Sequence, residues 1–302
     1  MRLWAWRRED GSETWGLDEG DGRLWDGGAH TGEPLHWAQA KVCEARGAVA
    51  FARAVGFAAR GGADGPLASR LQAEGRLLLP WRSPEVWAAG VTYKVSEDAR
   101  RRESASADIY ARVYDAERPE LFFKAGPGRV RGPGGRLGLR PDARWQVPEP
   151  ELALIVGAAG RIVGYTCGND MSCRDIEGEN PLYLPQAKIY DGACALGPAV
   201  LLAEPEEARS QPVFAIRLVI ERAGAGVFEG STDTGRMVRS FRALVDYLGQ
   251  AYTVAPGTAL LTGAGIVPPD DFSLAPGDRV RIAIEGIGEL VGECETVGVA
   301  GA

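Results

Sequence analysis

The amino-acid sequence predicts an α+β fold that consists mainly of β-strands. Segments of strand length, apolar or alternating, recur through the second half of the chain at residues 152–156, 213–220, 279–285 and 289–294. No regular alternation of strands with helices is present, which argues against a doubly wound sheet or a (β/α)₈ barrel. One apolar stripe at helical spacing predicts a core-facing helix and comprises Met237, Phe241, Leu244, Val245 and Leu248.

The chain is expected to divide into a small N-terminal α+β domain over residues 1–78 and a larger domain over residues 79–302. Its 302 residues exceed the usual size of one compact unit. A Gly- and Pro-rich break at residues 61–66 supports a boundary in this part of the chain.

Within the N-terminal part, the sequence predicts a β-hairpin followed by a helix. Gly20-Asp21-Gly22 is a turn signal between the strand-like residues 14–17 and 23–25. Residues 38–55 are Ala-rich, with apolar spacing typical of a helix. Farther along, residues 126–135 contain too many Gly and Pro residues for regular structure.

Composition excludes several classes of protein. The net charge of −7, from 34 basic and 41 acidic residues, argues against a general nucleic-acid binder. No apolar run approaches the roughly 18 residues that cross a bilayer, and residues 1–10 lack the apolar core of a secretory signal. The five cysteines are scattered and contain no CxxC pair, which is typical of reduced thiols. We therefore expect a cytoplasmic protein that binds neither nucleic acid nor membranes.

Histidine is scarce, which narrows the possible chemistry. His30 and His36 are the only two histidines, and both lie far from the polar segments of the second half. A Ser-His-Asp site or a His-rich zinc site would need one of them. The sequence instead favours proton transfer by Glu, Asp or Lys and a metal bound through oxygen atoms.

Glu149 and Glu151 form the most informative pair in the chain. They open the strand-like residues 152–156, and residues two apart on a strand point to the same face. Two carboxylates beside a core repel each other, and a hard cation such as Mg²⁺ removes that cost. Asp170 offers a third oxygen ligand after another strand-like segment. On spacing alone, two exposed acids held by flanking prolines remain the alternative.

The segment from residue 164 to 198 is dense in polar groups and includes Lys188. Residues 175–181 predict a loop beside the site. A lysine near a metal can have a lowered pKa and act as a base, whereas a solvated side chain is the simpler interpretation of any one lysine.

Seven segments in one order resemble the fumarylacetoacetate hydrolase superfamily over roughly residues 85–295. They are PELFFK (119–124), GPG (132–134), EPE (149–151), GYTCGNDMSCRD (164–175), QAK (186–188), LGP (196–198) and LTGAGIVP (261–268). The resemblance implies a mixed β-roll catalytic domain, bound Mg²⁺ (with Mn²⁺ or Ca²⁺ as substitutes) and a homodimer or homotetramer. It also implies that Glu149, Glu151 and Asp170 are the metal ligands and that Lys188 is the active-site lysine.

One departure from the hydrolytic members bears on the reaction. Those members carry an Asn-Tyr-x-x-His motif whose histidine activates water, whereas Ser96 stands at that position here. The patterns at residues 90–100, 118–124 and 177–183 are closer to the 2-keto-3-deoxy-D-arabinonate dehydratase branch. That similarity implies a metal-dependent lyase of pentose catabolism, which forms an enolate from a 2-keto-3-deoxy acid and expels the C4 hydroxyl.

For this reaction we expect Lys188 to remove the C3 proton and Glu120 to protonate the departing hydroxyl. The candidate substrate-binding residues are Thr262, Ser96, Arg100, Tyr93 and Arg174. Three alternatives stay open: a C–C bond hydrolase of acylpyruvate or 2,4-diketo acids, an oxaloacetate decarboxylase or tautomerase, and a non-catalytic binding protein.

Overall fold

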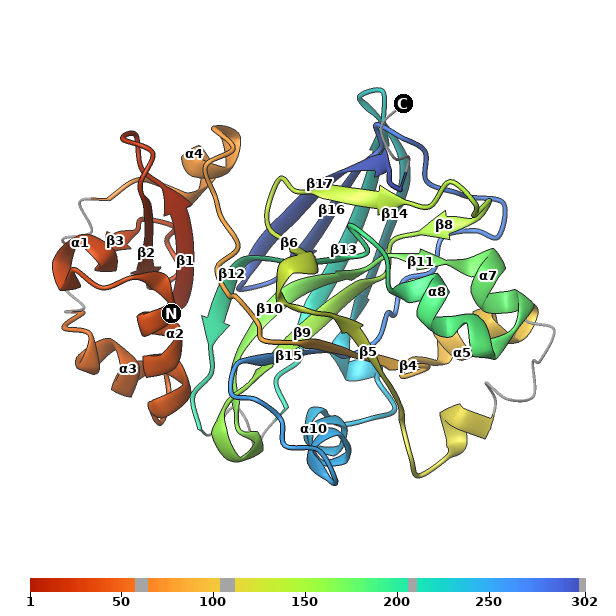
Figure 1. Ribbon diagram of the computed structural model, residues 1–302, viewed down its shortest axis with the longest axis horizontal. Coiled ribbons are helices and arrows are strands. Elements are labelled where there is room, and N and C mark those ends of the chain that lie inside the picture. The colour runs from red at the N-terminus through yellow and green to blue at the C-terminus, as the bar shows by residue number, and fades with distance from the viewer. Residues whose placement is uncertain (58–64, 104–111, 206–210, 299–302) are drawn as a thin grey trace.

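The computed structural model describes residues 1–57, 65–103, 112–205 and 211–298 (Figure 1). Within these residues one sheet has ten strands, in the order β3-β2-β1-β12-β10-β9-β15-β4-β5, with β6 paired to β12. Its strands are β1 (Arg2–Arg7), β2 (Glu13–Asp18), β3 (Trp25–Asp26), β4 (Val86–Gly90), β5 (Glu120–Ala125), β6 (Val130–Arg131), β9 (Pro150–Val156), β10 (Ile162–Asp170), β12 (Cys194–Leu202) and β15 (Thr258–Leu261).

A second sheet has five strands among the described residues, in the order β14-β13-β16-β17-β7. These are β14 (Ala225–Asp233), β13 (Ala215–Arg222), β16 (Arg279–Ile284), β17 (Gly288–Thr296) and β7 (Arg136–Leu139), while β8 (Gln146–Val147) pairs separately with β11 (Ser172–Cys173). The α-helices are α1 (Gly27–Thr31), α2 (Leu35–Glu44), α3 (Ala48–Ala54), α4 (Ala68–Ala73), α5 (Lys94–Glu103), α7 (Arg174–Glu179), α8 (Leu184–Lys188) and α10 (Phe241–Gly249). Short 3₁₀ turns are η1 (Pro127–Arg129), η2 (Ala158–Gly160), η3 (Pro181–Tyr183) and η4 (Thr234–Arg236).

The main core lies between the two sheets. Leu152 and Leu154 of β9 share one buried cluster with Ile216 and Leu218 of β13. Along β13 the burial alternates, as expected for a strand with one face in the core. Because β9 is buried on both faces, its residues Ala153 and Ile155 join a second cluster, which includes residues of α2 and α3. The mainly-β α+β class is confirmed.

The N-terminal strands continue the larger sheet. β1 pairs antiparallel with β12, where Arg2 lies opposite Leu201 and Leu3 opposite Val200. In Figure 1 this part of the chain forms the red and orange left-hand side, with α1, α2 and α3 beside β1–β3. The hairpin expected around Gly20-Asp21-Gly22 is present as β2 and β3.

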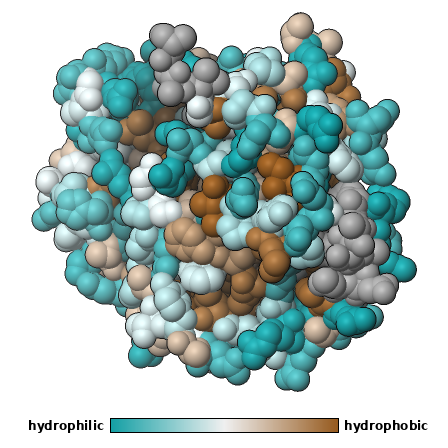
Figure 2. Space-filling model, turned by 45° about the vertical axis from the view of Figure 1, so that its right-hand side comes forward, coloured by the Kyte–Doolittle hydropathy of each residue, from teal (hydrophilic) through white to brown (hydrophobic). Residues whose placement is uncertain are grey.

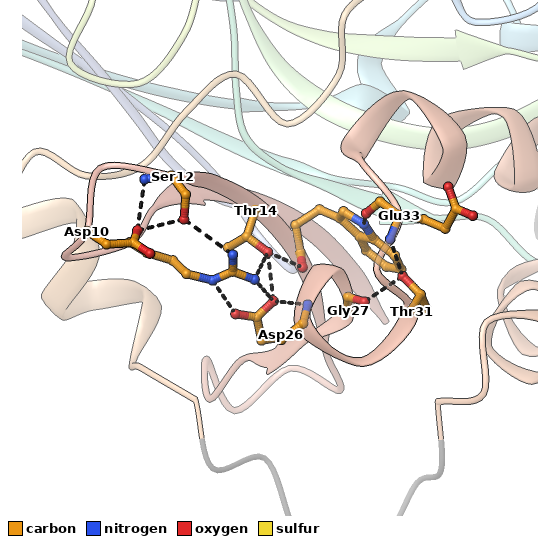
Figure 3. A network of polar contacts seen from close by, with 10 residues as sticks. Asp10, Ser12, Thr14, Asp26, Gly27, Thr31 and Glu33 are labelled. Carbon is orange, nitrogen blue, oxygen red and sulfur yellow. Dashed lines mark hydrogen bonds and ion pairs between the residues drawn. The ribbon is translucent and has the colours of Figure 1, made fainter.

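A polar network closes the N-terminal hairpin (Figure 3). The Arg8 guanidinium donates to both carboxylate oxygens of Asp26, at 2.9 and 2.8 Å, and to the Thr14 hydroxyl at 2.8 Å. Asp26 also caps α1 by accepting a hydrogen bond from the Ala29 amide at 2.9 Å. These contacts hold the end of β3 and the start of α1 against β2.

Two predicted elements differ from those observed. The helix expected over residues 38–55 is two helices, α2 and α3, because the chain turns at Gly47 with a φ of 104°, in the left-handed region. The loop expected over residues 175–181 is largely helix α7, whose first turn carries Asp175 and Glu177. Negative charges favour a helix N-terminus, which accounts for helix formation in so polar a segment.

Among the described residues, no helix combines the length and the apolar character that a bilayer span requires.

Candidate metal centre and active site

Glu149, Glu151 and Asp170 converge as the sequence predicted. Each offers one carboxylate oxygen, and the three oxygens lie within 4.8 Å of one another. The pairing of β9 with β10 brings them together, since Gly168 lies opposite Glu151 and the Asp170 amide donates to the Glu149 carbonyl at 3.0 Å. All three side chains are buried, with exposed fractions of 5 %, 1 % and 1 %.

The electrostatics of the cluster fit a divalent cation. Burial, followed by the charges of Asp170 and Glu149, raises the pKa of Glu151 well above its ordinary value. The Gly263 amide donates to Glu151 Oε2 at 2.6 Å, which orients that carboxylate. Three buried acids in contact form a donor set of hard oxygens, the kind that Mg²⁺ prefers.

Three cationic side chains surround the carboxylates. Lys188 Nζ lies 2.8 Å from Glu149 Oε2 and 3.1 Å from Asp170 Oδ2 and donates to the Ser172 hydroxyl at 2.6 Å. Arg174 Nη2 lies 3.0 Å from Glu149 Oε1. Lys124 forms an ion pair with Asp170 and donates to the Met171 carbonyl at 3.0 Å. Lys188 is thus held at the end of α8 beside the proposed metal ligands.

A small polar cleft opens beside this cluster. Its described walls are Ala89, Gly90, Val91, Ser96, Glu120, Phe122, Glu149, Asp170, Glu177, Lys188 and Ala264. Glu120 reaches it from β5, across from Gly90 of β4. Gly90 permits this approach, because a Cβ atom there would lie 2.0 Å from Glu120 Oε2. The candidate base, the candidate acid and two candidate metal ligands therefore border one space.

The other candidate substrate-binding residues have different surroundings. The Ser96 hydroxyl donates to the Ala264 carbonyl at the wall of the cleft. Thr262 is fully buried, and its hydroxyl donates to the Leu152 carbonyl at 2.9 Å. Tyr93 is also buried, and its hydroxyl has no hydrogen-bond partner in the part of the chain that the structure describes. The side chain of Arg100 lies outside the described residues, although α5 includes its backbone.

Three site residues were not among the sequence predictions. Lys124 closes the PELFFK segment, Ser172 belongs to the segment that carries Asp170, and Glu177 begins the ENPLY-containing pattern. All three segments are among those that resemble the fumarylacetoacetate hydrolase superfamily or its dehydratase branch, and this resemblance was the signal that could have identified the three residues. Spacing alone does not reveal Lys124, because its contact with Asp170 joins β5 to the end of β10, and these strands are distant in sequence.

Comparison with known proteins agrees with this geometry. Residues 85–294 match the family model described as fumarylacetoacetate (FAA) hydrolase C-terminal. The chain is 49 % identical over 219 residues to a probable 2-keto-3-deoxyxylonate dehydratase of Haloferax volcanii, which covers 72 % of this chain and 75 % of that protein. It is 42 % identical over 220 residues to the 2-dehydro-3-deoxy-D-arabinonate dehydratase of Saccharolobus solfataricus, which covers 72 % and 73 %.

Solved structures extend the similarity to nearly the whole chain. One is a 2-keto-3-deoxy-D-arabinonate dehydratase complexed with magnesium and 2,5-dioxopentanoate; it matches with a TM-score of 0.80 and 34 % identity over 98 % of this chain and 99 % of that chain. A fumarylacetoacetate hydrolase from Exiguobacterium antarcticum matches with a TM-score of 0.66 at 22 % identity, which shows a shared fold. The fold and the resemblance expected from the sequence are confirmed, and the chain belongs to the fumarylacetoacetate hydrolase family.

Proposed function

We propose that this protein is a Mg²⁺-dependent hydro-lyase that converts 2-dehydro-3-deoxy-D-arabinonate to 2,5-dioxopentanoate. The observation that carries the proposal is the position of Lys188, in contact with Glu149 and Asp170 and in the same cleft as Glu120. The relatives named as dehydratases and the solved complex with magnesium and 2,5-dioxopentanoate support the substrate class.

The chain's own residues would divide the work as follows. Glu149, Glu151 and Asp170 would hold Mg²⁺, which supplies Lewis acidity toward the 2-oxo group of the substrate. Lys188 would take a proton from C3, and Glu120 would give a proton to the departing C4 hydroxyl. Both side chains border the cleft, so one bound substrate can meet both.

The remaining candidate residues would bind or orient the substrate. Arg174 pairs with Glu149 and so would fix this ligand or meet the substrate carboxylate. Ser96 lies at the wall of the cleft, within reach of a substrate hydroxyl. Thr262 and Tyr93 are buried nearby, and burial, followed by the charges of Glu151 and Asp233, raises the pKa of Tyr93, which keeps its hydroxyl a donor. Arg100 stays a candidate on the family resemblance.

An NMR time course tests the reaction. Purified protein, Mg²⁺ and 2-dehydro-3-deoxy-D-arabinonate should give 2,5-dioxopentanoate, and excess chelator should abolish the conversion. Acetylpyruvate and oxaloacetate serve as comparison substrates. Faster release of pyruvate from acetylpyruvate, or of carbon dioxide from oxaloacetate, would contradict the assignment as a dehydratase.

We also propose that the protein is a homodimer or a homotetramer. The family resemblance implies an oligomer, and Leu182 and Val213 are large apolar side chains with exposed fractions of 83 % and 64 %. Figure 2 shows apolar surface gathered near the middle of one face, within a hydrophilic rim. Light scattering coupled to size-exclusion chromatography should give two or four times the 32.2 kDa chain mass, and a monomer would refute the proposal.

A cytoplasmic location is proposed from cysteine chemistry. Each of the five cysteines is a buried free thiol. Burial raises the pKa of Cys173 to about 11 and that of Cys167 to about 12, which keeps these thiols protonated and unreactive. Fractionation of the source cells with an antibody would test the location.

A further inference from the structure

This inference rests on the proposed function and concerns the second half of the reaction. Loss of a C3 proton and the C4 hydroxyl leaves 5-hydroxy-2-oxopent-3-enoate, which is an isomer of 2,5-dioxopentanoate. To reach the product, C5 must lose one hydrogen and the C5 hydroxyl its proton, while C3 and C4 each gain one proton. No external oxidant or reductant is needed, but the site must move protons at the far end of the substrate.

The cleft contains one ionisable side chain that the first half of the reaction leaves unused. Its described ionisable residues are Glu120, Glu149, Asp170, Glu177 and Lys188. Glu149 and Asp170 belong to the carboxylate cluster, and Lys188 contacts both of them. Glu120 is assigned to the C4 hydroxyl, so Glu177 remains.

Glu177 has the placement expected of a group that meets the substrate. It projects from α7, whose N-terminal residue is Arg174, and its exposed fraction is only 4 % although α7 is rich in charge. Glu179, two residues later on the same helix, is exposed and does not border the cleft. Mg²⁺ held by the carboxylate cluster would bind the C1 and C2 oxygens of the substrate, so C5 would extend away from the cluster, and Glu177 is a wall of the same cleft.

We propose that Glu177 is the catalytic residue that transfers protons in the second half of the reaction. Its carboxylate takes a proton from C5; the C5–H electron pair forms the C5=C4 bond, the C4=C3 pair forms C3=C2, and the C2=O pair moves onto oxygen. The protonated Glu177 then returns its proton to C3, which restores the 2-oxo group. The remaining C4=C5 enol takes a proton at C4 and loses its hydroxyl proton, giving the aldehyde.

The test separates the two halves of the reaction. Glu177→Gln preserves shape and removes the proton-accepting oxygen, and Glu179→Gln removes the same charge from an exposed position of α7. ¹H NMR follows the vinyl protons of the enone and the aldehyde proton of the product. Exchange of the C3 hydrogens of 2-oxopentanoate in D₂O, a substrate analogue without a leaving group, reports the first half alone.

We expect Glu177→Gln to slow aldehyde formation by about 10²-fold or more, with accumulation of the enone. Its C3 exchange should stay within about threefold of wild type, Glu177→Asp should recover part of the aldehyde rate, and Glu179→Gln should match wild type in both assays. Aldehyde formation at the wild-type rate without enone, or an equal loss of exchange and aldehyde, would overturn this role. If wild-type protein makes no 2,5-dioxopentanoate, the proposed function itself fails.

Discussion

The ammonium of Lys188 is fixed by three oxygen atoms, from Glu149, Asp170 and Ser172, all within 3.1 Å. Release of a proton from this ammonium would give an amine that can act as a base beside a substrate bound at the metal that these carboxylates would hold. We therefore expect Lys188→Met to lower C3 hydrogen exchange in 2-oxopentanoate by about 10²- to 10⁴-fold.

The control for this substitution is Lys41→Met, since Lys41 pairs with Glu44 on the surface of α2. It should leave exchange unchanged. Calorimetry should show that Lys188→Met still binds Mg²⁺. Exchange at the wild-type rate in Lys188→Met would show that another group removes the proton.

The raised pKa of Glu151 determines how the stability of the protein depends on pH in the absence of metal. Its folded-state pKa is raised, mainly by burial and then by Asp170 and Glu149, so the folded protein holds this proton more tightly than the unfolded chain. The stabilisation is present below the unfolded pKa of about 4.3 and is lost as the pH rises through the raised folded value. Denaturant titrations in chelator should thus show a free energy of unfolding that falls over this window.

Glu151→Gln removes that dependence on pH. In chelator it should be at least as stable as wild type at neutral pH, because it no longer carries a buried charge. Wild type should gain about 2.7 kcal/mol at a Mg²⁺ concentration one hundred times its Kd, and Glu151→Gln should lose this gain. An equal gain in the free energy of unfolding in both proteins would show that Glu151 is not a ligand of the metal.

At the scale of elements, the pairing of β4 with β5 places the candidate acid. Gly90 lies opposite Glu120, and a Cβ atom at position 90 would lie 2.0 Å from its carboxylate. Gly90→Ala should therefore displace Glu120 and lower the dehydration rate by about 10²-fold, with the thermal midpoint within a few degrees of wild type. Gly226→Ala in β14, where an added Cβ meets no atom within 4 Å, is the control. Unchanged kinetics for Gly90→Ala would place the acid elsewhere.

The local hydrophobic pattern predicted whether a segment is a helix or a strand for the elements that bury one face. The residues predicted as strands at 213–220, 279–285 and 289–294 correspond to β13, β16 and β17, with ends shifted by one or two residues. The predicted helix stripe is α10, although Met237 lies outside it, because Ser240 caps the helix by accepting from the Ala243 amide. Polar segments such as α7 have no apolar period, so composition predicted a loop, whereas the acidic residues of the first turn favour a helix there.

At the scale of the whole molecule, Arg161 joins the two parts of the chain. It lies between β9 and β10, and its guanidinium donates to the carbonyls of Cys43 and Ala45 at 2.7 and 2.9 Å. These carbonyls end α2, where a cation is favourable. Arg161→Ala should lower the free energy of unfolding by about 1.5–3 kcal/mol, measured by denaturant titration.

Arg217→Ala is the matched control, since Arg217 forms an exposed pair with Glu229 and should contribute less than about 1 kcal/mol. Equal effects of the two substitutions would show that Arg161 does not fasten the parts together. The boundary at residues 78 and 79 stays a proposal, and limited proteolysis of Arg161→Ala would test it through cleavage near that position.

The candidate site was predictable only in part. Glu149 and Glu151 followed from strand spacing, Asp170 and Lys188 were candidates from the polar segment at residues 164–198, and the resemblance supplied Glu120. Long-range contacts explain the rest: the buried Lys124 comes from β5 and reaches Asp170 at the end of β10, and no local pattern encodes such an approach.

The ion pairs around the carboxylates link the binding of the metal ion to the binding of the substrate. Among the described residues three acids face three bases, namely Glu149, Glu151, Asp170, Lys124, Lys188 and Arg174. The formal charges of these six side chains therefore cancel, and a divalent ion bound among them adds two positive charges. An anionic 2-oxo acid offsets part of this excess, so each ligand should strengthen the affinity for the other by the same factor. A chelator should accordingly strip the resting protein more readily than the protein saturated with substrate.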